Sequence, residues 1–165
     1  MSSLVVADAG PLIGMARTGH LFILKNLYNS ISISSRVFEE LKVSSHKPGT
    51  MALSEAINAG WIKIVELNKS SDSSVLRLLI DAGEAEAIQL AMEKNARLLI
   101  IDDRKGRKIA KSRGIKVIGT GGILILAKRA GILDRVSPVL NELSDAGYRL
   151  SPDLFKRIME LADEG

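Results

Sequence analysis

Two short apolar segments of the chain each end in aspartate, and this pattern constrains the fold more than any other feature. Residues 4–7 are Leu-Val-Val-Ala and precede Asp8, while residues 98–101 are Leu-Leu-Ile-Ile and precede Asp102 and Asp103. Apolar runs of this length are typical of strands buried on both faces of a parallel sheet. An aspartate after such a strand is also typical of a helix cap. Because parallel strands end at a common edge of the sheet, the two acidic ends together predict a functional site there.

Strand and helix signals alternate along the rest of the chain, without internal repeats or a long linker. Further strands are expected at residues 31–34, 61–65 and 116–118, with helices between them and at about residues 122–130, 134–146 and 151–164. This alternation predicts an α/β fold, in which a parallel β-sheet is covered by helices on both faces. We expect one domain over residues 1–165, with a C-terminal helical extension from about residue 134 to residue 165.

The composition narrows the chemistry that the chain can perform. Its 165 residues include no cysteine and only two histidines, His20 and His46. This excludes disulfides, thiol nucleophiles and cysteine-ligated zinc, and two isolated histidines argue against a Ser-His-Asp triad. Hydrolytic chemistry would therefore depend on carboxylates. No apolar run approaches the ~18 residues of a membrane helix, and the N-terminus lacks the basic region of a signal peptide. We expect a cytoplasmic protein that does not associate with a membrane.

One glutamate occupies an unusual position on a predicted helix. In the helix from residue 83 to residue 95, Ile88 and Ala91 mark the apolar face, and Glu84 lies in line with them. A carboxylate that points inward is costly unless it is paired, hydrogen-bonded or bound to a metal. The alternative is a glutamate of the first turn that complements the helix dipole. Glu86, in contrast, is expected on the opposite, solvated face.

A second predicted helix, over residues 36–43, repeats this pattern more weakly. Glu40 lies at the border of the apolar face, next to Val37 and Leu41, whereas Glu39 lies on the opposite side. A border glutamate is often simply solvated, so this position alone leaves both interpretations open. Several acids that converge on one cleft repel each other unless a divalent cation shares them. Ligation by oxygen atoms alone suits magnesium or manganese.

The segment after the second acidic strand end is strongly basic. Residues 104–113 contain six basic side chains and no acid, on a chain whose net charge is only +4: Arg104, Lys105, Arg107, Lys108, Lys111 and Arg113. The rest of the chain is therefore slightly acidic. A basic helix beside a carboxylate cluster suits a polyanion, because lysine and arginine hold phosphates while a metal acts on one of them. The alternative is an ordinary solvated helix face.

The order of these motifs resembles that of the PIN-domain nucleases, most closely the small prokaryotic VapC-like proteins. The resemblance covers about residues 4–161 and rests on DAGPLI, VFEEL, DAGEAEAI, LLIIDDRKGRKIA and IKVIGTGGIL. The four acids of the family fall, in order, on Asp8, on Glu40 (or Glu39), on Glu84, where many members have aspartate, and on Asp103 or Asp102.

This resemblance implies a three-layer α/β/α sandwich and a ribonuclease that depends on Mg²⁺ or Mn²⁺. It implies a homodimer and, for a toxin, a protein antitoxin that silences it. The implied catalytic residues are Asp8, Glu40, Glu84 and Asp103. The implied metal ligands are Asp8, Glu84, Asp102 and Asp103. The residues expected to contact RNA are Arg104, Lys105, Arg107, Lys108 and Thr120, although Thr120 could instead contact the metal site or cap the following helix.

The sequence leaves three alternative functions open. The chain could be a non-catalytic PIN-like module that binds RNA or protein, or an RNA-processing nuclease outside toxin–antitoxin systems. The inward position of Glu84 argues against the non-catalytic module, which has no need of a buried carboxylate. A doubly wound nucleotide-binding protein is the third alternative, and the lack of a GxGxxG motif after the first strand argues against it.

Overall fold

The fold is seen in a computed structural model, which describes residues 2–165. The strands are β1 (Val5–Ala7), β2 (Ile31–Ile33), β3 (Ile62–Ile64), β4 (Leu98–Ile100) and β5 (Val117–Ile118). The helices are α1 (Ala9–Arg17), α2 (Phe22–Tyr28), α3 (Ser35–Leu41), α4 (Thr50–Asn58), α5 (Ser74–Arg77), α6 (Ala82–Glu93), α7 (Arg104–Ser112), α8 (Thr120–Arg129), α9 (Ser137–Asp145) and α10 (Pro152–Leu161).

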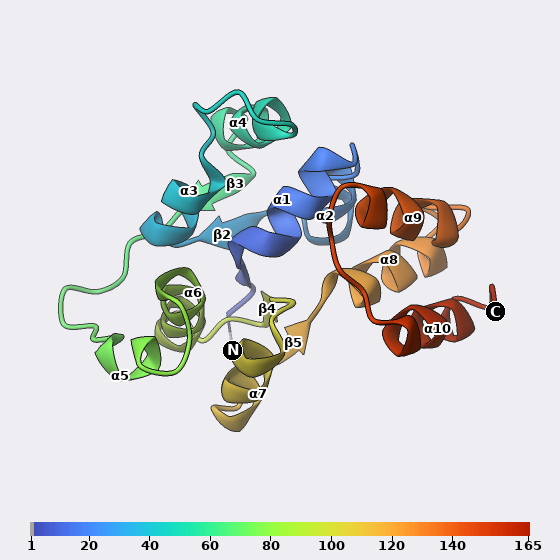
Figure 1. The fold of residues 1–165 in the computed structure, drawn as a ribbon. Helices are drawn as coiled ribbons and strands as arrows, with labels where there is room; N and C mark the ends of the chain where they lie inside the picture. Colours follow the sequence, from blue (N-terminus) through green and yellow to red (C-terminus); the bar gives the residue numbers. More distant parts are fainter. Residues whose placement is uncertain (1) are drawn as a thin grey trace.

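All five strands form one parallel sheet in the order β3-β2-β1-β4-β5. Figure 1 shows α1, α2 and α4 on one side of this sheet and α6 and α7 on the other. The strands β1 and β4 are apolar throughout because both of their faces are covered, and Val6, Leu99 and Ile33 of β2 are fully buried. The predicted fold class, a three-layer α/β/α sandwich with a parallel sheet, is therefore confirmed.

The order of the strands explains why the site forms where it does. β1 lies at the centre of the sheet, between β2 and β4, and the chain reverses its direction of winding between β3 and β4. In open parallel sheets, ligands bind beyond the carboxyl ends of the strands at such a reversal. Asp8 follows β1 and Asp102 follows β4 closely, so both lie at this edge.

The C-terminal helices share the hydrophobic core with the rest of the chain. α9 packs against α1, and α10 packs against α8. Leu140, Leu143 and Ile158 are buried in the same apolar cluster as the central strands. The described part of this segment thus covers one end of the sheet rather than forming a bundle of its own (Figure 1). The division of residues 1–165 into a domain with an extension stays a prediction, and residue 1 lies outside the described residues.

Helix boundaries differ from the sequence-based expectation at two places. The helix predicted to end near Asp81 is the short α5, which ends at Arg77, and Asp81 instead caps the start of α6. The expected turn at residues 119–122 is mostly helical, because α8 already begins at Thr120. The break predicted near Gly19 is confirmed, since this residue has a φ of +76° between α1 and α2. Across residues 2–165, no helix combines the length and apolar character needed to span a membrane.

Candidate functional site

Asp8 lies where the central strand ends, and its side chain is almost inaccessible. Its backbone N–H donates a hydrogen bond of 2.9 Å to the carbonyl oxygen of Ile100, which holds the ends of β1 and β4 together. The residue is 8% exposed. Burial, together with the charges of Asp81, Glu40 and Asp102, raises the pKa of Asp8 to about 7. The charged groups that act on the Asp8 carboxylate are therefore acids, and its ionised form is not balanced by positive charge.

Glu84 projects from the first turn of α6 toward the same edge of the sheet. Burial raises the pKa of Glu84 to about 8, with additional contributions from the charges of Asp81, Asp103 and Asp8. The inward position predicted from the helical pattern is consistent with this half-buried side chain. Glu84 therefore shares its electrostatic environment with Asp81 at the start of its own helix and with Asp8 and Asp103 of two other segments.

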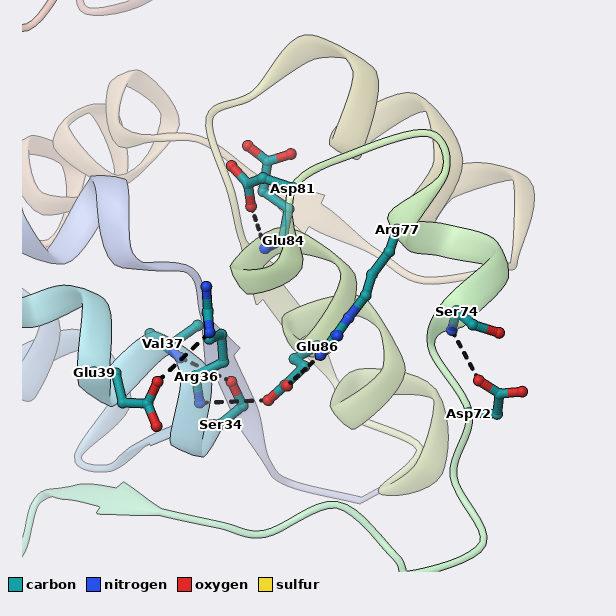
Figure 2. A network of polar contacts seen from close by, with 10 residues as sticks. All are labelled: Ser34, Arg36, Val37, Glu39, Asp72, Ser74, Arg77, Asp81, Glu84 and Glu86. Carbon is teal, nitrogen blue, oxygen red and sulfur yellow. Dashed lines mark hydrogen bonds and ion pairs between the residues drawn. The ribbon is translucent and has the colours of Figure 1, made fainter.

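Asp81 lies among the same acids as Asp8, Glu40 and Glu84, which together form the acidic cluster. The sequence reasoning did not identify Asp81 as one of them. Its Oδ1 accepts a hydrogen bond of 2.8 Å from the backbone N–H of Glu84, so it caps α6 (Figure 2). Its charge also raises the pKa values of Asp8, Glu40 and Glu84. The spacing Asp-x-x-Glu at a helix start, typical of a capping box, was the signal that could have revealed it.

The two neighbouring glutamates of α3 have different surroundings. Glu39 is exposed and forms an ion pair with Arg36 at 3.7 Å (Figure 2). Glu40 is half-buried, and its carboxylate lies against Gly83 so closely that a Cβ at Gly83 would be 2.6 Å from the Glu40 Cδ. Burial raises the pKa of Glu40, and the charge of Asp81 adds to the increase. Of the two, Glu40 faces the acidic cluster.

Asp102 and Asp103 have different partners. The Oδ1 of Asp102 accepts a hydrogen bond from the backbone N–H of Thr120, and its Oδ2 accepts one from the Thr120 hydroxyl, both at 2.7 Å. Asp103 caps α7 by accepting a bond of 2.7 Å from the N–H of Gly106. Thr120 is only 1% exposed. This burial against Asp102 favours the alternative that Thr120 serves the metal site by positioning that carboxylate, and its contact with RNA stays a prediction.

The four basic residues predicted to bind RNA differ in their exposure and in their contacts. Arg104, Lys105 and Lys108 are exposed on α7. Arg107 is half-buried, and its Nη1 donates a hydrogen bond of 3.0 Å to the carbonyl oxygen of Ile101. Of the four, Arg107 lines a cavity together with Asp102 and Asp103. The structure thus brings one of these basic side chains next to the acidic cluster.

Glu86 was expected on the solvated face of its helix, and the structure corrects this. Its side chain is only 16% exposed and forms an ion pair of 3.1 Å with Arg77 of α5. It also accepts a hydrogen bond of 3.3 Å from the backbone N–H of Arg36 at the start of α3 (Figure 2). The helical pattern missed this role because both partners come from other segments. Glu86 fixes α3, and with it Glu40, relative to α6.

The donor chemistry of the cluster suits a hard divalent cation. All candidate ligands are carboxylate oxygens, which magnesium and manganese prefer. The raised pKa values of Asp8, Glu40 and Glu84 mean that the cluster gains stability from added positive charge. Among the residues that the structure describes, no three acidic, histidine or cysteine side chains are already arranged to hold a metal ion. Binding would therefore require rotation of these side chains toward a common point.

Comparison with known proteins identifies the family. A family model described as a PIN domain matches residues 4–164, which is nearly the whole chain. No curated protein gives a significant match. The family match agrees with the parallel α/β/α architecture and with the resemblance seen in the sequence motifs. Members of this family generally have a nuclease fold and typically use divalent metals, and the chain belongs to the PIN-domain family.

Proposed function

We propose that this protein is an endoribonuclease that depends on Mg²⁺ or Mn²⁺ and hydrolyses phosphodiester bonds of RNA. The observation that carries the proposal is the convergence of Asp8, Glu40 and Glu84, whose pKa values are all raised by burial and by neighbouring acids. A protein gains nothing in stability from such mutual repulsion. The cluster is what a site for a divalent cation requires, and a module that only binds RNA or protein has no use for it.

The proposed metal ligands are Asp8, Glu84, Asp102 and Asp103. A bound divalent cation supplies a Lewis acid that polarises the phosphoryl oxygen and lowers the pKa of a bound water molecule. Asp8 contributes a carboxylate shielded from bulk water, which strengthens its interaction with positive charge. Glu84 lies among the same acids, and its carboxylate oxygens can orient the attacking water by accepting a hydrogen bond from it.

The remaining residues orient this cluster. Thr120 holds both oxygens of Asp102 in one rotamer through its two hydrogen bonds. Glu40 lies at the border of the site on α3 and completes the catalytic set that we propose. Arg107 is anchored to the end of β4 and supplies positive charge for a phosphate of the substrate.

The proposal is tested by cleavage of single-stranded RNA with Mg²⁺, with Mn²⁺ and with EDTA. Wild type should cleave in either metal and not in EDTA, and Asp8→Asn should lose at least about a hundredfold in rate. Asp145→Asn, an exposed aspartate of α9, is the matched control and should retain the wild-type rate. Cleavage that persists both in EDTA and in Asp8→Asn would overturn the mechanism.

We propose a toxin of a toxin–antitoxin pair as the biological setting, with a homodimer as the assembled form. Support comes from the resemblance of the motifs to those of VapC-like proteins. Induced expression should then arrest growth with wild type and not with Asp8→Asn, at equal protein levels. Equal growth of both strains would favour a role in RNA processing outside toxin–antitoxin systems.

A further inference from the structure

A cavity of about 470 Å³ lies between the acidic cluster and the C-terminal segment of the chain. Asp102 and Asp103 line it, and so do Leu154 and Ile158 of α10. Its volume falls within the range of ordinary small-molecule sites, about 300–1,000 Å³. The cavity therefore adjoins two carboxylates of the proposed nuclease site.

The cavity wall combines apolar, aromatic and cationic groups. Leu154 and Leu161 line it and remain 48% and 40% exposed, so both present apolar surface to the cavity. Tyr148 contributes an aromatic ring. Arginines of three different segments also line the wall, namely Arg107 of α7, Arg149 of the loop before α10 and Arg157 of α10.

Two glycines at the start of α8 give the cavity its shape. A Cβ at Gly119 would lie 2.8 Å from the Asp102 Oδ1 and 3.0 Å from the Arg107 Nη1. The missing side chain thus allows a carboxylate and a guanidinium to lie side by side at the end of the cavity. A Cβ at Gly121 would lie 2.5 Å from the Cδ1 of Ile158, so this glycine allows α10 to approach α8 closely.

We propose that this cavity is a nucleotide subsite of the nuclease. The base next to the scissile phosphodiester packs on Leu154, Leu161 and the ring of Tyr148, and the flanking phosphate binds Arg149 and Arg157. A flat apolar surface with an aromatic ring holds a base, and arginine binds phosphate through paired N–H donors. This inference rests on the proposed ribonuclease function and assigns substrate binding to the C-terminal segment rather than to the exposed face of α7.

The position of the acids favours RNA over an acidic peptide as the occupant. A peptide carboxylate in the cavity would meet the like charges of Asp102 and Asp103, which Arg107 lies beside and offsets in part. A nucleotide, in contrast, places its base on the apolar wall and needs only one phosphate, which Arg149 and Arg157 bind. The apolar wall beside the arginines provides a place for the base, which the exposed basic face of α7 does not offer.

The test measures binding to the intact chain in EDTA, where metal-dependent turnover cannot occur. The probes are the four nucleoside 5′-monophosphates, a short single-stranded RNA, inorganic phosphate and an acidic peptide. Methyl resonances of Leu154, Leu161 and Ile158 should shift with nucleotides and RNA and not with inorganic phosphate. Arg149→Ala and Arg157→Ala should each weaken RNA binding by about three- to tenfold. Each should also reduce the slope of the logarithm of the binding constant against the logarithm of salt concentration by about one.

Matched variants separate this cavity from general effects of charge and surface polarity. Leu154→Asp should weaken RNA binding by about tenfold, whereas Leu126→Asp, on a leucine of α8 that is 38% exposed and outside this cavity, should change it less than about twofold. Arg113→Ala removes an exposed arginine at the far end of α7 and should likewise have little effect. Thermal unfolding of each variant confirms that the fold is retained.

The outcomes distinguish this proposal from the proposed activity. If the chain cleaves RNA but Arg149, Arg157 and Leu154 variants bind and cleave like wild type, the subsite is overturned and the ribonuclease stands. A tighter response of the same methyl groups to the acidic peptide than to RNA also overturns it. If nucleotides bind in the cavity but RNA is never cleaved, the subsite is supported and the ribonuclease fails.

Discussion

Thr120 donates two hydrogen bonds to Asp102, one from its backbone N–H to Oδ1 and one from its hydroxyl to Oδ2, each of 2.7 Å. Both residues lie at the carboxyl edge of the sheet, Asp102 after β4 and Thr120 at the start of α8. The pair joins two strand ends and leaves Asp102 little rotational freedom. A side chain that is 1% exposed thereby controls the direction of a proposed metal ligand.

Removal of the Thr120 hydroxyl should impair the site without unfolding the protein. Thr120→Val keeps the shape and the backbone hydrogen bond but leaves Oδ2 of Asp102 without this donor. We expect apparent metal affinity or cleavage rate to fall by about 10- to 100-fold. Thr120→Ser retains the donor and should restore most of the activity. Titration of Mn²⁺ against cleavage rate measures this, and equal behaviour of valine and serine variants would contradict it.

Gly83 should be required for the position of the Glu40 carboxylate. In Gly83→Ala the new Cβ would collide with this carboxylate, whose Cδ would be only 2.6 Å away. Because Glu40 is partly exposed and flexible, we expect its side chain to turn away with a small change in stability but a fall in RNA cleavage of about tenfold or more.

A matched glycine provides the control for this substitution. Gly10 of α1 has no atom within 4 Å of a Cβ built on it, so Gly10→Ala should leave cleavage unchanged. Glu40→Gln should reproduce the loss seen in Gly83→Ala, whereas Glu39→Gln should not. Loss of activity in Glu39→Gln alone would mean that the other glutamate of α3 serves the site.

In the absence of metal, the stability of the protein should fall as the pH rises from about 4 to about 8. The folded state raises the pKa of Asp8 from 3.8 to about 7 and that of Glu84 from 4.5 to about 8, in both cases chiefly through burial. The folded protein therefore binds more protons than the unfolded chain in this range, and loses that advantage as these groups ionise. Melting temperatures in EDTA across this pH range measure the effect.

Two comparisons test the cause of this pH dependence. Asp8→Asn should flatten the decline, because its side chain has no proton to lose, and Mg²⁺ added at pH 8 should raise the melting temperature of wild type more than that of the variant. Asp145→Asn should retain the wild-type slope. A melting temperature that is constant from pH 4 to pH 8 in EDTA would contradict the prediction.

Glu164 should stabilise the C-terminal helices. It accepts hydrogen bonds from the backbone N–H groups of Val136 (2.7 Å) and Ser137 (3.1 Å), and it pairs with Lys128 at 3.0 Å. Although burial raises the pKa of Glu164, these contacts together lower it to about 2. Glu164→Gln should destabilise the fold by about 1–3 kcal/mol at pH 7.

The pH range of this contribution follows from the lowered pKa. The stability that Glu164 provides is complete above its unfolded pKa of 4.5 and is lost as the pH falls toward 2. Glu160→Gln, which removes an exposed pair with Arg157 at 3.9 Å, is the control and should change stability little. Urea unfolding at pH 7 and pH 3 measures both variants, and equal losses in the two would refute the role of Glu164.

The fold was predicted from the sequence because its signals are local. The apolar runs before Asp8 and Asp102 identify buried parallel strands, and the helical segments between them require crossovers on both faces of the sheet. Chain order alone also places Asp8, Glu84 and the pair Asp102–Asp103 near one edge. The inward position of Glu84 followed from its spacing to Ile88 and Ala91, because a helix repeats every 3.6 residues.

Only the tertiary structure decided which neighbours each polar side chain has. Sequence spacing could not show that Thr120 is buried against Asp102, because these residues meet across two strand ends, 18 positions apart. It could not show that Glu86 binds Arg77 and α3, or that Arg149 and Arg157 reach the cavity beside Asp102. Periodicity fixes which face of its own element a side chain occupies. The partner on that face comes from another element, and its identity depends on how the whole chain packs.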